Sequence, residues 1–240
     1  MASQHIVRSF EEELNHVHDL LAQMGAVTTT QISSAIQALA DRNSDLAAEV
    51  ITGDREVDKL ESKIDDLAVK MLALRQPMAL DLRVVVSALK ISSDLERIAD
   101  YAANVAKRAI ALNQVPFIPP VIAIPGMGKL ARQMVEDVLD AFARRDVESA
   151  LKVWSRDEEL DEMYSSVFRE LLGYRIVDPG GVTAATHVLF VAKNIERIGD
   201  HATNIAEKIH FMIVGQPLTG ARPKHDESSF AVAKPNGCNT

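Results

Sequence analysis

The stretch Asp94-Leu-Glu-Arg-Ile-Ala-Asp-Tyr-Ala-Ala-Asn-Val-Ala-Lys107 has a similar second copy in this chain of 240 residues. It returns 100 positions later (94 to 194) as Asn194-Ile-Glu-Arg-Ile-Gly-Asp-His-Ala-Thr-Asn-Ile-Ala-Glu207. Apolar residues run through both stretches at steps of three and four, the period of a long bundle helix. They are Ile91, Leu95, Ile98, Ala102, Val105, Ala109 and Leu112 in the first stretch, and Val191, Ile195, Ile198, Ala202, Ile205, Ile209 and Met212 in the second. The stretch therefore predicts a long helix that occurs twice.

A second set of matches lies upstream, where Asp54-Arg-Glu-Val-Asp58 returns 103 positions later (54 to 157) as Asp157-Glu-Glu-Leu-Asp161. The same offset pairs Gly25 with Gly128, and Ala38-Leu-Ala-Asp-Arg42 with Ala141-Phe-Ala-Arg-Arg145. The change of offset from 103 to 100 places three additional residues between the second and third helices of the first unit. The chain is therefore predicted to be two tandem three-helix units, which we call the first copy and the second copy.

Glycine and proline, 11 and 9 residues, together make up 20 of 240, below average usage, and they are clustered between long uninterrupted segments. This distribution argues against turn-rich β-folds, and the predicted class is all-α. The domain prediction is a first three-helix repeat over 1–115, a second over 116–215, and a disordered tail over 216–240. The predicted helices span roughly 4–41, 46–74, 79–113, 122–144, 147–172 and 183–214.

The linker between the copies contains an unusually apolar segment, Phe117-Ile-Pro-Pro-Val-Ile-Ala-Ile124. Two interpretations are open. The segment either packs between the two halves of the chain or forms an exposed strip on which a partner docks.

Composition excludes several classes of protein. The only cysteine, Cys238, cannot form an intramolecular disulfide or a cysteine-based zinc site. No apolar run is long enough to cross a membrane, and the N-terminus turns acidic at Glu11 instead of resembling a signal peptide. A net charge of −8 argues against nucleic acid as a partner. A cytoplasmic protein is expected. Because no nucleophile is paired with a base, the chain is predicted not to be an enzyme.

Repeated acids on the second and third helices are the strongest functional signal. Glu96, Asp100 and Asn104 share one helical face nearly opposite the apolar residues, as do Glu196, Asp200 and Asn204. Asp54, Asp58, Glu61 and Asp65 form a similar stripe on the second helix, and Asp157 and Asp161 repeat its first two members. We expect these acids to point outward, with Arg97 and Arg197 pointing away from them.

Outward positions have no packing reason to match between copies, and neighbouring like charges destabilise a helix by about 0.2–0.5 kcal/mol a pair. A multivalent cation would reverse that effect, and carboxylate oxygens suit hard metal ions. The pattern therefore predicts metal binding. One alternative is that the acids only form solvated surfaces on a structural scaffold. Another is an iron-binding or oxidase-type helix bundle, which would use the Glu-x-x-His spacings Glu13/His16 and Glu207/His210.

Taken together, these motifs resemble the PhoU family of regulators of bacterial phosphate uptake. The similarity is carried by Arg75-Gln-Pro-Met-Ala-Leu-Asp-Leu-Arg83, Leu95-Glu-Arg-Ile98 and Ile195-Glu-Arg-Ile-Gly-Asp200, and it covers roughly residues 5 to 215. The resemblance implies two tandem three-helix bundles. It also implies a non-enzymatic cytoplasmic regulator that restrains the phosphate-starvation response by coupling a phosphate ABC transporter ATPase to a phosphate-sensing histidine kinase.

The resemblance further implies which acids hold metal ions, with iron, zinc, manganese or magnesium as candidates. By position, the ligands are Asp54, Asp58, Glu96 and Asp100 in the first copy, and Asp157, Asp161, Glu196 and Asp200 in the second. Ala99 stands where the second copy has Gly199, a difference expected to matter little. Family members are commonly homodimers, and the family implies contact with the membrane only through its partners.

Overall fold

The computed structural model describes residues 2–174 and 179–219, and within them every regular element is helical. The all-α prediction is confirmed. The elements are α1 (Ala2–Ala40), α2 (Ser44–Arg75), α3 (Leu80–Leu112), a short 3₁₀ helix η1 (Pro119–Ala123), α4 (Ile124–Arg144), α5 (Val147–Ser155), α6 (Asp157–Gly173) and α7 (Pro179–Val214). Of the predicted tail over 216–240, the part from residue 220 onward, with Cys238, lies outside the described residues. None of the described helices is long and apolar enough to cross a membrane.

The turns that follow α1 and α4 have the same geometry, as the repeat predicts. Arg42 and Arg145 both adopt a left-handed conformation, with φ of 53° and 52°. The next residues, Asn43 and Asp146, each accept hydrogen bonds on their side chains from the first turn of the following helix. Such capping groups satisfy backbone N–H groups that have no partner within the helix.

The predicted single helix over 147–172 is wrong, because the structure divides it at Arg156 into α5 and α6. At this point Glu159 donates its N–H to the carbonyl of Arg156 at 3.2 Å, three residues back instead of four. Three consecutive acids, Asp157 to Glu159, occupy the first turn of α6. Negative charge at a helix N-terminus is favourable, which stabilises the start of a new helix there.

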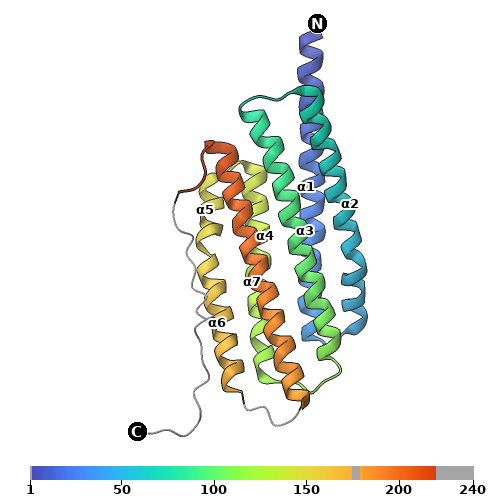
Figure 1. Cartoon of the computed structure of the whole chain (residues 1–240), viewed down its shortest axis with the longest axis vertical. Helices are drawn as coiled ribbons and strands as arrows, with labels where there is room; N and C mark the ends of the chain where they lie inside the picture. The colour runs from blue at the N-terminus through green and yellow to red at the C-terminus, as the bar shows by residue number, and fades with distance from the viewer. Residues whose placement is uncertain (1, 175–178, 220–240) are drawn as a thin grey trace.

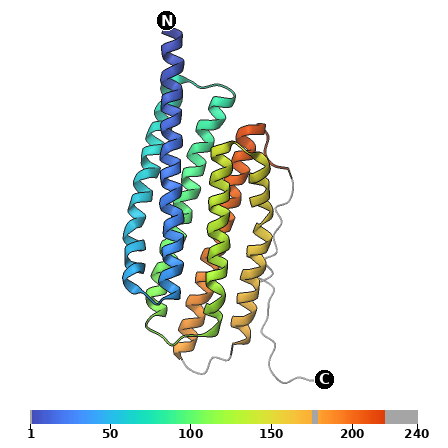
Figure 2. The same ribbon diagram turned by 180° about the vertical axis from the view of Figure 1, so that it is seen from behind.

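The two copies lie side by side, with α1–α3 forming one bundle and α4–α7 the other (Figures 1 and 2). The repeated helices α3 and α7 run antiparallel along the interface, where Arg83 donates to the Met212 carbonyl at 3.2 Å. Halfway along, His201 Nδ1 lies 2.8 Å from Asp94 Oδ1, and its ring lies 5.6 Å from that of Tyr101. All fourteen apolar residues predicted from the repeated stretch are buried in one continuous core.

The apolar linker packs against the second copy in part and is exposed in part. Ile118 and Pro120 are buried, and η1 contacts α4, α6 and α7. Phe117 and Ile122, in contrast, are largely exposed. Leu74, near the C-terminal end of α2, is also exposed.

Candidate functional site

The first acid cluster, Asp54, Asp58, Glu96 and Asp100, forms where α2 packs against α3. Burial, followed by the neighbouring Asp100 and Asp58 carboxylates, raises the pKa of Asp54. Burial also raises the pKa of Glu96 to about 7, and the nearby Asp100 and Asp58 act in the same direction. The four predicted side chains therefore share one electrostatic environment in which full ionisation is unfavourable.

Glu61 belongs to the same environment although it was not among the predicted ligands. Its pKa is raised by burial first and then by Asp65 and Asp58. Its place on the acidic stripe of α2 was the available signal. Arg97, expected to point away, instead lies 3.5 Å from a Glu96 oxygen and 3.6 Å from an Asp100 oxygen. The prediction for Arg97 is wrong because its long side chain can bend back across the helix surface.

The second acid cluster, Asp157, Asp161, Glu196 and Asp200, is far more buried than a helical wheel suggests. Only 1% of Asp157, 2% of Asp161 and 4% of Glu196 is exposed. The prediction that the acids point outward is therefore wrong for these three residues of the second copy, whereas Asp200 is partly exposed. A wheel considers one helix alone, whereas here α6 and α7 cover each other's acidic faces.

Gly199 explains how the two helices approach so closely. A Cβ atom on Gly199 would lie 2.4 Å from Leu160 Cδ2 and 3.6 Å from Asp157 Oδ1. The absence of a side chain thus admits Leu160 and Asp157 of α6 to the surface of α7. The first copy has Ala99 at the equivalent position, and there Asp54 and Asp58 remain partly or fully exposed. The difference between Ala99 and Gly199, expected to matter little, accompanies a change in burial.

Glu196, in the second cluster, has a strongly raised pKa. Burial raises its pKa to about 7. A hydrogen bond from Lys193 acts to lower this pKa, whereas the Asp200 and Asp161 carboxylates act to raise it. Lys193 Nζ donates to Glu196 Oε1 at 2.8 Å, whereas the buried Oε2 has no hydrogen-bond partner. A buried carboxylate oxygen without a partner is unfavourable, so this group has an unused capacity to bind a cation or a proton.

The donor chemistry of both clusters suits hard metal ions, since each offers four carboxylates and the second includes an orphaned buried oxygen. Within residues 2–174 and 179–219, however, no three His, Cys, Asp or Glu side chains converge closely enough to enclose one ion. The structure thus brings the eight predicted residues together as two groups of four without closing either into a coordination shell.

Three of the four residues in the two Glu-x-x-His spacings have other partners. Glu13 forms an ion pair with Arg75 at 2.9 Å, and Glu207 accepts a hydrogen bond from the Trp154 indole at 3.2 Å. His210 lies 3.1 Å from the carbonyl of Gln216. The Glu13 and Glu207 motifs therefore serve separate local contacts on α1 and α7.

Comparison with known proteins agrees with this architecture. The family model described as "PhoU domain" matches twice, over residues 21–109 and 124–209, one match in each copy. The chain is 50% identical over 225 residues to the phosphate-specific transport system accessory protein PhoU homolog of Caulobacter vibrioides, covering 93% of this chain and 98% of the relative. It is 36% identical to the PhoU protein of Escherichia coli over 214 residues, covering 89% of each chain.

Solved structures show the same fold. The crystal structure of PhoU from Pseudomonas aeruginosa matches with a TM-score of 0.82 and 38% identity, covering 86% of this chain and all of that one. The phosphate transport system regulatory protein PhoU from Streptococcus pneumoniae matches with a TM-score of 0.80 and 29% identity, over 88% of this chain and 99% of that one. With both helical units and nearly the full length matched, this chain belongs to the PhoU family.

Proposed function

We propose that this protein is a non-enzymatic accessory regulator of phosphate-specific transport. The observation that carries the proposal is similarity over both copies and nearly the whole length to proteins that are named accessory or regulatory proteins of that transport system. In this role it acts in the cytoplasm and restrains the phosphate-starvation response by coupling the ATPase of a phosphate ABC transporter to a phosphate-sensing histidine kinase. Contact with the membrane is made through these partners.

The test is a reporter gene driven by a phosphate-starvation promoter. Deletion of the gene for this protein should activate the reporter in phosphate-rich medium, and the intact gene supplied from a plasmid should restore repression. A reporter that stays repressed after deletion would contradict the regulatory role. Pull-down of the purified transporter ATPase and of the kinase by the full chain would separate loss of one partner from loss of the other.

We further propose that the two acid clusters bind divalent or trivalent metal ions, with iron, zinc, manganese and magnesium as candidates. The raised pKa values of Glu96 and Glu196 and the orphaned Glu196 Oε2 support this, because a cation would compensate the crowded carboxylates. Asp54, Asp58, Glu96 and Asp100 would hold one site, and Asp157, Asp161, Glu196 and Asp200 the other. A bound cation would supply charge that draws α2 to α3, and α6 to α7.

Elemental analysis of protein purified without chelator tests the metal proposal. The wild type should contain metal, and Asp100→Ala with Asp200→Ala should remove it while the helical circular dichroism persists. A matched control, Asp66→Ala with Asp140→Ala, removes two exposed acids outside the clusters and should leave the metal content unchanged. If the wild type contained as little metal as the double variant, the proposed metal sites would be refuted. We also propose that the chain forms a homodimer, as the family resemblance implies, and sedimentation of the same samples tests this.

A further inference from the structure

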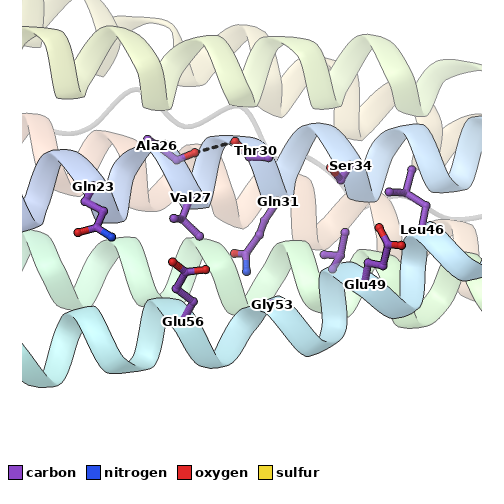
Figure 3. A pocket seen from close by; sticks show the side chains of 11 residues that line it. Gln23, Ala26, Val27, Thr30, Gln31, Ser34, Leu46, Glu49, Gly53 and Glu56 are labelled. Atoms are coloured by element: carbon purple, nitrogen blue, oxygen red, sulfur yellow. Dashed lines mark hydrogen bonds between the residues drawn. The ribbon is translucent and has the colours of Figure 1, made fainter.

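An open groove of about 430 Å³ lies between α1 and α2. Figure 3 shows the side chains that line it, which come from these two helices only. Apolar groups form most of its walls, among them Val27, Leu46 and Val50, while Glu49 and Glu56 are exposed beside it. Neither glutamate forms an ion pair in the described part of the chain.

Gln31 lies within this lining and is only 6% exposed. Its side chain extends from α1 toward α2, where a Cβ atom on Gly53 would lie 3.7 Å from the amide nitrogen (Figure 3). Neither Nε2 nor Oε1 has a hydrogen-bond partner, and the buried hydroxyl of Thr28 also lacks one. Burying a polar group without a partner costs about 1–3 kcal/mol, so the amide does not help the isolated bundle.

The second copy provides an internal comparison at the offset of 103 residues. Met134 and Ala131 stand in place of Gln31 and Thr28, and both are completely buried. An apolar side chain therefore fills the equivalent space without an unsatisfied polar atom. Packing alone gives no reason for an amide at position 31.

In the second copy, an ion pair occupies the positions equivalent to part of the groove lining. Arg156 and Asp137 occupy the positions of Gly53 and Ser34, and Arg156 Nη1 lies 2.6 Å from Asp137 Oδ2. This ion pair spans the space that glycine and serine leave open in the first copy. In addition, Lys152 stands where the first copy has Glu49, so the charge beside the groove is reversed.

We propose that this groove binds a positively charged segment of a partner protein. Its apolar walls receive an apolar side chain of that segment, and Glu49 and Glu56 pair with flanking lysine or arginine residues. A peptide group or carboxamide offers both a donor and an acceptor, which is what the Gln31 amide lacks, and rotation of the Gln31 side chain brings the amide to the ligand. Because the groove is open along two helices, it suits a polypeptide laid across it better than a small molecule, which needs to be largely enclosed. The inference goes beyond the proposed regulation and does not depend on the metal sites.

Three variants taken from the second copy test it. Ser34→Asp with Gly53→Arg closes the groove, Gln31→Met removes the amide, and Glu49→Lys reverses the charge. Phage-displayed random dodecapeptides are selected on the full wild-type chain, and selected peptides are then synthesised and titrated against all four proteins. We expect enrichment of peptides in which lysine or arginine flanks an apolar residue, with binding about tenfold or more weaker to each variant, a difference of about 1.4 kcal/mol.

Urea unfolding of the same proteins checks that the fold is retained. Gln31→Met should raise the unfolding midpoint, because it replaces an unsatisfied amide by an apolar group. A lowered midpoint would mean that the amide is a packing group and would overturn the proposal. Failure to enrich basic peptides, or equal binding to wild type and the closed variant, would also overturn it. So would a wild-type dimer that dissociates in the closed variant, since the occupant would then be a second copy of this chain.

Discussion

Gly25 of α1 and Leu139 of α4 are in such close contact that a Cβ atom on the glycine would lie 2.5 Å from Leu139 Cδ1. The repeat produces the same contact in reverse, because a Cβ atom on Gly128 of α4 would lie 2.5 Å from Ile36 of α1. Gly25 and Gly128 are equivalent at the offset of 103, and so are Ile36 and Leu139. The two copies thus pack through one contact made twice, with each glycine receiving the apolar side chain of the opposite helix.

Gly25→Ala should lower the free energy of unfolding by about 1 kcal/mol. Overpacking against Leu139 costs about 1–3 kcal/mol, which exceeds the gain of about 1 kcal/mol that alanine brings to a helix interior. Gly53→Ala is the matched control, since its nearest neighbour outside the helix backbone would be 3.7 Å away, and it should stabilise the protein. Urea unfolding measures both. Stabilisation by Gly25→Ala would show that Leu139 moves aside freely.

The metal-free protein should be less stable at about pH 8 than at about pH 5. The pKa of Glu196 rises to about 7 in the folded protein, so its contribution is present below the ordinary value of 4.5 and is lost as the pH rises through about 7. For this buried group the loss is about 3 kcal/mol. Glu96 acts in the same direction, but with a smaller effect because its side chain is more exposed.

Glu196→Gln should remove most of this pH dependence in urea unfolding experiments, whereas Glu159→Gln, at an exposed position on α6, should retain it. Saturating metal should reverse the slope, because protons and metal compete for the same carboxylates. A metal-free protein that becomes steadily more stable from pH 5 to pH 8 would contradict the assignment of Glu196.

The contact between Asp94 and His201 should couple the two halves of the chain. Their atoms lie 2.8 Å apart and both side chains are mostly buried, so a double-mutant cycle with Asp94→Ala and His201→Ala should give a coupling energy of about 1 kcal/mol. Asn194→Ala at the position equivalent to Asp94 is the control, with an expected change within about 0.5 kcal/mol. Additive effects of Asp94→Ala and His201→Ala would mean that the contact does not stabilise the interface.

Arg42 and Arg145 should respond differently to glycine although they share a left-handed backbone. Arg42 Nη2 donates to the carbonyls of Leu112, Asn113 and Val115 at 2.8–3.0 Å and so holds the end of α3. Arg42→Gly should therefore destabilise the protein by about 1–2 kcal/mol. Arg145→Gly should be neutral or stabilising by up to about 1 kcal/mol, because glycine adopts positive φ without strain. Thermal unfolding compares the two, and equal effects would refute the role of the Arg42 side chain.

The sequence predicted the core residues correctly but not the buried acids, the division at Arg156 or the groove. Ile98 and Ile198 were placed in the core correctly, because periodic apolar residues must be buried whatever the helices pack against. Asp157 and Glu196 were placed wrongly, because their burial depends on how closely α6 approaches α7, which Gly199 permits. The division at Arg156 was missed because no glycine or proline marks it. The groove depends on Gly53, Ser34 and Gln31, which meet only when α1 and α2 pack.

The sequence by itself determined the helical class, the duplication and the eight acids, because helical period and internal repeats are properties of residue order along one chain. The tertiary structure alone decided that the two acid clusters differ in burial and that Glu196 carries an orphaned oxygen. It also decided that the first copy has an open groove where the second has an ion pair. These properties depend on distances between helices. The size of the side chains at each helix contact fixes these distances, and a glycine, which has no side chain, allows the closest approach.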